Sequence, residues 1–398
     1  MTASPTSTAA PMRGPLAALL WACFLGSSWT WVIGMLFPIL LVRDYGLWGW
    51  VVFAIPNVLG ATAMGFVIAT PEHSRALVEK HREAALRFSE ITIVYHVFVV
   101  GAWYQLMFGN WAILATAAVL ILVFIAAGQR RALLASAVIV TLISLAIFVF
   151  WCAQQGVALH LPAQPRLAVT DLLLFACASL VGFALCPYLD LTFHRARQHT
   201  DAPTGQLAFA LGFGVVFLLM IVFSLWYAQT LRVMTINTTA LPQGVILALG
   251  AHLTIQAGFT IALHLREVAQ RRGHAGLHRV FVLAIAAGAL AWWALSEPFT
   301  TYYDLTIGEV VYRVFLLFYG LAFPAYVFLC MIPTRRPVAR NLRLIVFAIA
   351  LLAAVPMGYA GFVAGHSWWI AGALGALAAG RGVIDLWSMR ANHGRTAD

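Results

Sequence analysis

Long apolar stretches recur along the whole chain and are separated by short polar breaks. Each stretch holds roughly 20 residues, the length that an α-helix needs to cross about 30 Å of hydrocarbon. The pattern therefore predicts an all-α polytopic membrane protein with about twelve transmembrane helices. The predicted helices begin near residues 17, 47, 84, 110, 131, 168, 206, 243, 279, 307, 341 and 367.

The first and sixth of these stretches combine small residues with a later proline. The first reads "CFLGSSWTWVIGMLFPILLVRDYG" over residues 23–46, and the sixth carries Ala178, Ser179 and Gly182 before Pro187. Five helices separate the two, and an odd number of crossings inserts a second copy upside down. Residues 15–155 and 156–333 are thus predicted to form an inverted pair of five-helix repeats, with two helices appended over 334–388. The alternative is that these prolines and glycines reflect only their general frequency in membrane helices.

Basic residues indicate the orientation, because Lys and Arg near helix ends are retained on the cytoplasmic side. With the N-terminus inside, all of the 24 basic residues except Arg43, Arg166, Arg232 and Arg313 fall in cytoplasmic segments. Residues 1–14 and 389–398 are then cytoplasmic tails, and the first is expected to be disordered. Arginine greatly outnumbers lysine, which together with short loops indicates a bacterial inner-membrane protein.

Composition excludes a soluble domain, because 62% of the residues are hydrophobic, 10% are charged and the mean hydropathy is +0.89. The net charge of +10 is spread over the loops, so it reflects topology and predicts no nucleic-acid partner. The five cysteines lie in apolar stretches without a CxxC pair, which predicts neither a disulfide framework nor a zinc site. No cofactor and no resident metal are expected.

The residues "FLGSSWTWVIGMLFPILLVRDYGLWGWVVFAIPNVLGA" resemble the start of the amino acid–polyamine–organocation superfamily, which has the LeuT-type fold. The likeness is nearest to its sodium:solute symporter branch, and it extends more faintly over residues 175–197. The resemblance implies that the first and sixth helices unwind near the bilayer centre to bind substrate and coupling ion. It would place the two breaks at Gly26, Ser27 and Ser28 and at Ala178, Ser179 and Gly182.

Ionisable and polar residues at membrane depth are costly and are candidates for function. His96 and His252 are expected near the midplane, as substrate ligands or proton carriers, or as neutral histidines bonded to a neighbouring helix. Glu90 and Asp190 could pair with Arg87 or His194, either as an inner gate or as structural bridges. Further substrate-binding candidates at useful depths are Trp29, Thr30 and Gln256.

The coupling ion is expected to be Na+ or H+. A sodium site of this fold uses hydroxyls on the eighth helix, but Thr254 and Thr260 are separate here and form no adjacent pair. That departure leaves room for protons through His252, with Thr254, Glu90 and Asp190 as the other coupling candidates. Glu309 and Arg313 are four residues apart and are expected to neutralise one another near the outer end.

These features together favour a secondary active transporter for a small polar solute. Its only other partner is the lipid bilayer, and a Gly372, Ala376, Gly380 stripe leaves open a monomer or a homodimer. No HExxH, GxSxG or Walker-type motif is present, so no enzyme is expected. The alternatives are a transporter-like sensor or inactive paralogue, a major-facilitator-type transporter, and a membrane-embedded haem or metal protein.

Overall fold

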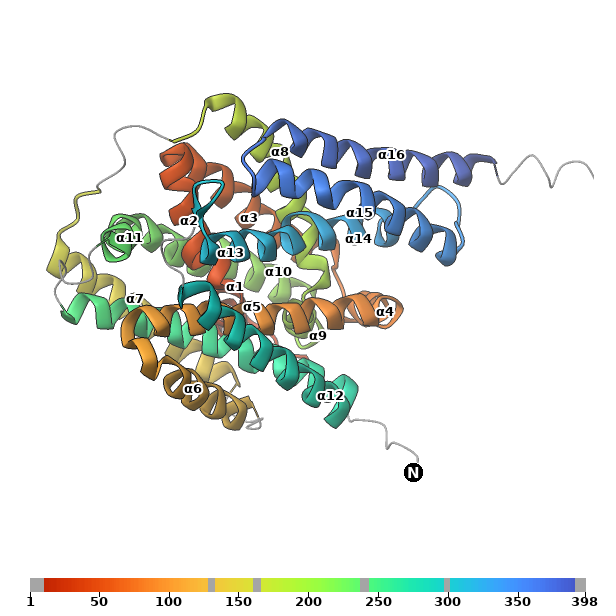
Figure 1. The fold of residues 1–398 in the computed structure, drawn as a ribbon. Helices are drawn as coiled ribbons and strands as arrows, with labels where there is room; N and C mark the ends of the chain where they lie inside the picture. The colour runs from red at the N-terminus through yellow and green to blue at the C-terminus, as the bar shows by residue number, and fades with distance from the viewer. Residues whose placement is uncertain (1–10, 128–132, 160–165, 237–242, 297–300, 391–398) are drawn as a thin grey trace, which may run out of the picture.

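The computed structural model describes residues 11–127, 133–159, 166–236, 243–296 and 301–390. Almost all of these residues are helical, and the one sheet among them is a two-stranded hairpin (Figure 1). The α-helices are α1 Pro15–Trp29, α2 Val32–Tyr45, α3 Leu47–Val67, α4 Pro71–Lys80, α5 Arg82–Phe108, α6 Ala112–Ala127, α7 Leu133–Gln155, α8 Val169–Leu185, α9 Leu191–Gln198, α10 Ala202–Leu211, α11 Leu218–Ile236, α12 Gln243–Ser296, α13 Ile307–Leu317, α14 Phe323–Tyr326, α15 Arg340–Phe362 and α16 Trp368–Arg390.

Shorter segments complete the fold. Two are 3-10 helices, η1 Gly109–Trp111 and η2 Cys186–Leu189. Three are π-helices, η3 Gly212–Phe217, η5 Phe318–Ala322 and η6 Val327–Met331. The strands β1 Thr301–Tyr302 and β2 Leu305–Thr306 pair antiparallel across Tyr303 and Asp304, whose positive φ angles suit a two-residue hairpin turn.

Within the described residues, nine helices are long and apolar enough to cross a membrane, or ten if α1 and α2 count as one bent span. The chain is therefore an all-α multi-pass membrane protein, as its sequence predicts. The long helix α12 contains one non-helical residue, Gly273 (φ 60°), which separates the stretches expected to begin near 243 and 279. Only glycine adopts this left-handed conformation without strain. The count of twelve helices and the inverted repeat stay predictions.

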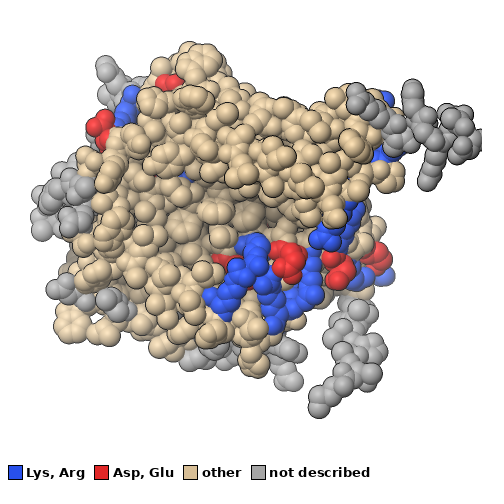
Figure 2. Space-filling view, turned by 45° about the vertical axis from the view of Figure 1, so that its right-hand side comes forward, with Lys and Arg blue, Asp and Glu red and all other residues tan. Residues whose placement is uncertain are grey.

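Charged side chains gather at the ends of the molecule and leave an uncharged belt between them (Figure 2). Helices α12, α15 and α16 run lengthwise through the molecule in Figure 1. We call the end with α4, α9 and Gly273 the inner end and the end with the β-hairpin the outer end, following the predicted orientation. A belt of apolar side chains is what a surface in contact with lipid requires.

Most of the buried side chains form one hydrophobic core, and α15 and α16 make a second, smaller one with the chain from Leu321 to Cys330. Figure 1 shows α15 and α16 side by side along one edge of the molecule. Small residues allow the helices of the main core to approach closely. A Cβ atom at Gly60 would lie 2.2 Å from the Phe183 carbonyl oxygen, so α3 and α8 touch along their backbones.

Candidate functional site

The first predicted span is interrupted inside the protein. Helix α1 ends at Trp29, Thr30 and Trp31 leave the helical conformation, and α2 begins at Val32 with a bend of 57°. The Gly26 oxygen keeps its backbone bond from the Thr30 N–H (3.0 Å) and also accepts from the Thr30 hydroxyl (2.7 Å), while the Ser28 oxygen accepts from the Trp31 indole. Side chains of the break itself therefore bond to the last turn of α1, where a helix end leaves carbonyl groups without regular backbone partners.

The expected position of this break, at Gly26, Ser27 and Ser28, is wrong. All three residues lie within α1 and are buried. Gly26 provides close packing, since a Cβ atom there would lie 2.5 Å from Val216 Cγ1 and 2.9 Å from the Gly212 oxygen. Ser27 is bonded to Thr141 of α7 (2.9 Å between the hydroxyl oxygens). Small residues in this span thus serve packing between helices, and the chain unwinds after them.

The sixth predicted span also leaves the α-helical conformation later than expected, at the end of the candidate span Val169–Leu189. Ala178, Ser179 and Gly182 lie within α8, and the irregular segment runs from Cys186 to the extended residue Asp190. Pro187 lies in the first turn of this segment, where a missing N–H is tolerated. The Asp190 carboxylate then caps α9 by accepting from the Thr192 backbone N–H and hydroxyl, both at 2.7 Å.

The two breaks lie against each other. The Thr192 hydroxyl oxygen lies 3.4 Å from the Ser28 hydroxyl oxygen, and the rings of Trp29 and Phe193 pack with centroids 4.9 Å apart. The Trp29 indole in turn donates to Asn57 Oδ1 of α3 (2.6 Å). Of the residues that the sequence analysis singled out, Ser28 and Trp29 lie against the segment that Asp190 begins, with Thr192 between Ser28 and Asp190, and Asn57 is a neighbour that sequence reasoning missed.

His96 of α5 bonds to the break between α1 and α2. Its Nδ1 lies 2.7 Å from the Thr92 carbonyl oxygen and its Nε2 lies 3.4 Å from the Val32 backbone nitrogen. A neutral ring with the proton on Nδ1 satisfies both contacts, because Nε2 then accepts from the N–H group. Tyr312 completes the contact from α13 by donating its hydroxyl to the Val32 carbonyl oxygen (3.0 Å). His96 thus holds freed backbone in place.

The region where the break after α1 meets the segment from Cys186 to Asp190 is called the junction below. Trp31 fills its centre. Its ring lies within 6 Å, centroid to centroid, of Phe88, His96, His264 and Tyr319, and the side chain is 1% exposed. Neither Trp31 nor His264 was expected here from the sequence. His264 could have been found from the sequence by the rule that selected His252, because it too is an ionisable side chain in an apolar stretch.

His252 and Gln256 of α12 meet at a serine. Ser144 Oγ of α7 lies 3.1 Å from His252 Nδ1 and accepts from Gln256 Nε2 at 2.9 Å. All three side chains are fully buried. Thr254, in contrast, is half-buried and bonded to the Tyr104 hydroxyl of α5 (3.1 Å), so the structure does not bring it to the same face of α12.

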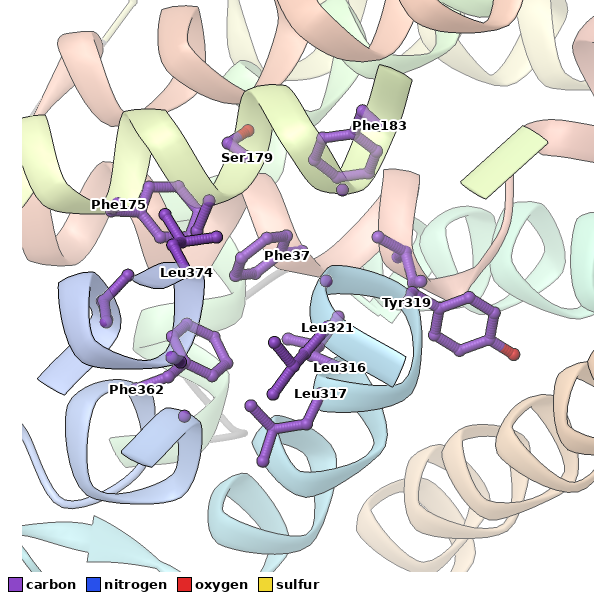
Figure 3. A pocket seen from close by; sticks show the side chains of 17 residues that line it. Phe37, Phe175, Ser179, Phe183, Leu316, Leu317, Tyr319, Leu321, Phe362 and Leu374 are labelled. Atoms are coloured by element: carbon purple, nitrogen blue, oxygen red, sulfur yellow. The ribbon is translucent and has the colours of Figure 1, made fainter. Parts of the chain in front are cut away.

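Ser179 and Gly182 line a cavity of about 80 Å³ between α2, α8, α13, α15 and α16 (Figure 3). Rings and leucines form its walls, including Phe37, Phe175 and Phe362. The Ser179 hydroxyl donates to the Val52 oxygen (2.9 Å), and the Tyr319 hydroxyl points away and donates to Thr92 (3.0 Å). With both hydroxyl groups engaged, this cavity suits an apolar group and not the polar solute that was expected.

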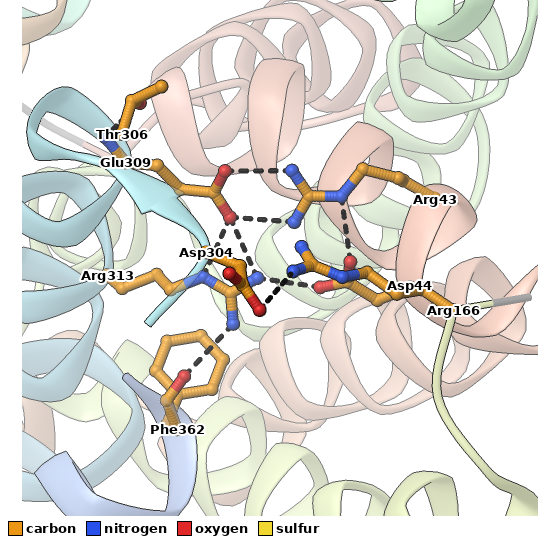
Figure 4. A network of polar contacts seen from close by, with 8 residues as sticks. All are labelled: Arg43, Asp44, Arg166, Asp304, Thr306, Glu309, Arg313 and Phe362. Atoms are coloured by element: carbon orange, nitrogen blue, oxygen red, sulfur yellow. Dashed lines mark hydrogen bonds and ion pairs between the residues drawn. The ribbon is translucent and has the colours of Figure 1, made fainter. Parts of the chain in front are cut away.

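An ionic network, which we call the outer network, joins α2 to α13 at the outer end (Figure 4). Arg43 contacts both oxygens of Glu309 at 2.7 and 2.8 Å, and Arg313 contacts Asp44 at 2.6 Å. Arg313 also bonds to Glu309 (2.9 Å), as its spacing predicts, and donates to the Phe362 oxygen (3.0 Å). Asp44 is 2% exposed, so little water reaches the pairs.

A second set of ion pairs, which we call the inner network, surrounds Glu90 and Glu267. Glu90 contacts Arg87 at 2.7 Å, as predicted, and also Arg272 and Arg279 at 3.5 Å. Glu267 contacts Arg195 at 2.5 Å and Arg271 at 3.4 Å, which joins α9 to α12. Figure 2 shows basic and acidic side chains gathered at this end of the molecule.

His194 takes no part in the inner network. Its Nδ1 lies 2.9 Å from the Ser74 hydroxyl of α4 and its Nε2 lies 3.0 Å from the Tyr188 oxygen. The expected pairing of Asp190 with His194 is therefore replaced by the cap on α9. Asp190 Oδ2 is buried and has no hydrogen-bond partner in the described part of the chain.

Among the described residues, His, Cys, Asp and Glu form no group of three or more that could hold a metal ion. No protein-family model matches the chain, and no curated protein matches it. The geometry of the junction is therefore the basis for the function proposed below.

Proposed function

We infer that the chain is a secondary active transporter, which moves a small solute by alternating access around the junction of the two broken helices. The observation that carries this inference is the contact between the two breaks through Ser28 and Thr192. Interrupted helices inside a membrane protein are tolerated only when their backbone groups are buried or face a cavity. Two of them side by side provide peptide groups and helix ends that can bind a solute.

A transporter that works by alternating access also needs contacts that can close it at each end, and the two networks of ion pairs can provide them. The outer network links α2 to α13 and the inner network links α5, α9 and α12. Helix α2 is the second half of the bent span, and α9 is the short helix that follows the span Val169–Leu189, so each network holds a helix next to one of the two breaks. Opening one network at a time would expose the junction to one side only, which is the definition of alternating access.

The coupling ion is proposed to be Na+ or H+, and the location is proposed to be the bacterial inner membrane with both ends cytoplasmic. In this orientation the basic side chains of the inner network lie on the cytoplasmic side of the membrane, where Lys and Arg are usually retained. His96 is hydrogen-bonded at both nitrogens, so its proposed role is to hold the backbone of the break in place and not to carry the ion. Asp190, with one unpartnered carboxylate oxygen at the break, is the group best placed to meet a cation.

Thiol accessibility tests this proposal without knowledge of the solute. Ser28 is replaced by Cys in a background in which the five native cysteines are substituted, and a small membrane-impermeant thiol reagent is applied to either side of sealed vesicles. Arg313→Gln is expected to speed labelling from the outer side and Glu267→Gln from the inner side. Each should act by about tenfold, because loss of a buried ion pair shifts a closed–open equilibrium.

The control thiol is placed at Thr116, which is buried on α6 away from either network. Its labelling should not respond to Arg313→Gln or Glu267→Gln. If Ser28→Cys stays equally protected from both sides in every variant, the junction does not alternate and the transporter proposal fails. A sensor that binds without transporting would then be the better description.

A further inference from the structure

Four polar residues lie on one face of α12, in four successive turns: His252, Gln256, Thr260 and His264. A spacing of four residues places side chains one above the other on a helix. With a rise of 1.5 Å per residue, the row is about 18 Å long, more than half of the thickness of the hydrocarbon core. All four side chains are 0% exposed. We call this row the polar row.

Each member of the polar row has an atom that no described residue bonds. These atoms are His252 Nε2, Gln256 Oε1, Thr260 Oγ1 and His264 Nε2. A buried polar atom without a partner costs about 1 to 3 kcal/mol, so four in succession on one helix face need a common explanation. Water is the one small ligand that bonds equally well to imidazole, amide and hydroxyl groups.

The two histidines at the ends of the row are held in the same way. His252 Nδ1 faces Ser144 Oγ of α7 at 3.1 Å, and His264 Nδ1 faces Ser89 Oγ of α5 at 3.0 Å. Each ring therefore has its Nδ1 at a serine hydroxyl and its Nε2 buried without a partner in the described part of the chain. His96 differs from both, because its two nitrogens are bonded to protein backbone.

The surroundings of the row place few charges near the rings. Around His252, α11 contributes the rings of Phe223 and Tyr227, and the Tyr227 hydroxyl donates to the Met35 oxygen. Around His264 lie Phe88 and His96 of α5 and Trp31. The charged groups near its inner end are Glu267 with Arg195 and Arg271, and Asp190, which interacts electrostatically with Glu267.

We propose that the polar row is a water-filled proton pathway. A hydrated proton binds His252 Nε2 and forms an imidazolium; the imidazolium then gives one proton from Nε2 to a water molecule held by Gln256 and Thr260. The same exchange occurs at His264 Nε2, so one proton enters for each one that leaves. Glu267 and Asp190 lie at the inner end, where the proton would leave. The pathway identifies H+ as the coupling ion and, to that extent, rests on the proposed transporter function.

Hydrogen–deuterium exchange at the histidine C2 position, read by mass spectrometry, tests the pathway on the purified protein. This exchange requires water at the ring and reports protonation of each histidine. His252 and His264 are expected to exchange about tenfold faster than His96, although all three are fully buried, because ring protonation through water lowers the barrier. Equal protection of the three rings would overturn the proposal.

The matched variants are Thr260→Val and Thr254→Val, which remove a hydroxyl from the same helix, on the row and away from it. Thr260→Val should slow exchange at His252 or His264 and lower proton flux into proteoliposomes driven by a potassium diffusion potential. Thr254→Val should change neither. Equal effects of the two variants would refute the pathway. Both readouts are independent of Ser28→Cys labelling, so a failure of alternating access and a failure of the proton pathway can be told apart.

Discussion

Two glutamates of this chain have arginine partners three residues away, in opposite surroundings. Glu72 pairs with Arg75 at 3.2 Å with 75% of its side chain exposed, whereas Glu90 pairs with Arg87 at 2.7 Å with 2% exposed. Water and mobile ions screen the first pair more strongly than the second, in which the Glu90 carboxylate is buried and Arg87 is 41% exposed. The same spacing in the sequence therefore produces two interactions of different strength.

Replacing Glu90 by Gln is expected to lower the free energy of unfolding by about 2 kcal/mol, because Arg87 and Arg279 then lose this carboxylate and Arg272 keeps only Glu83. Glu72→Gln should leave it unchanged within error. Denaturant titration in detergent micelles measures both. A Glu90→Gln protein as stable as Glu72→Gln would show that the buried cluster contributes no net stability.

Individual site residues were predictable from the sequence where their chemistry was conspicuous. Charged and imidazole side chains in apolar helices pointed to Glu90, His96, His252 and Asp190, and all four are buried within the protein. Trp31 and Asn57 gave no such signal, because aromatic and amide side chains are common in membrane helices. Thr254 was predicted to belong to the site and does not reach it. Its hydroxyl lies on another face of α12 and is bonded to Tyr104 of α5.

At the scale of the element, hydrophobic length predicted the helices well and the positions of the breaks poorly. An apolar run defines a span by the cost of leaving backbone groups in lipid. A break instead occurs where other groups can take over the freed hydrogen bonds, here His96 and Tyr312 from two other helices. Those partners are distant in sequence, so Gly26 and Gly182 looked like breaks when they are packing contacts.

Gly26→Ala tests this revised role. The new methyl group would lie 2.5 Å from Val216 Cγ1, so α1 and η3 must separate, and a loss of about 1 to 3 kcal/mol in unfolding free energy is expected. Gly288→Ala on α12 is the control, since nothing lies within 4 Å of its Cβ position. It should leave stability unchanged or raise it slightly, through better helix propensity. Similar stability losses in the two variants would argue against the close contact.

For the whole molecule, the all-α membrane fold followed from composition and periodicity alone. The division into two charged ends and an apolar belt followed from the placement of Lys and Arg (Figure 2). Neither pattern contains information on which helices touch. The joining of α2 to α13 by Arg43 and Glu309, for example, links residues 266 positions apart.

The stability of the whole protein should also depend on pH through His81, which joins the inner ends of α4 and α14. Its Nδ1 lies 3.1 Å from the Tyr326 hydroxyl, and burial, with the nearby charges of Lys80, Arg340 and Arg343, lowers its pKa from 6.5 to about 4. The unfolded chain therefore binds a proton more readily than the folded one. The stabilising contribution of neutral His81 to the folded protein is complete above pH 6.5 and is lost as the pH falls toward 4.

His81→Gln, which cannot titrate in this range, should reduce the fall in melting temperature between pH 7 and pH 5 by roughly 2 to 4 °C. Thermal unfolding of both proteins in the same detergent measures the difference. Identical pH profiles would mean that His81 is protonated to the same extent in both states.

The π-helices η5 and η6 have a consequence for movement. They lie on either side of α14, after the helix α13 that carries Glu309 and Arg313. A π-turn holds one residue more than an α-turn. Passing that surplus residue along the helix rotates the side chains between its old and new positions while every other turn stays intact. Tyr319 and Tyr326 could thus swing around the axis without the helix ever having to melt.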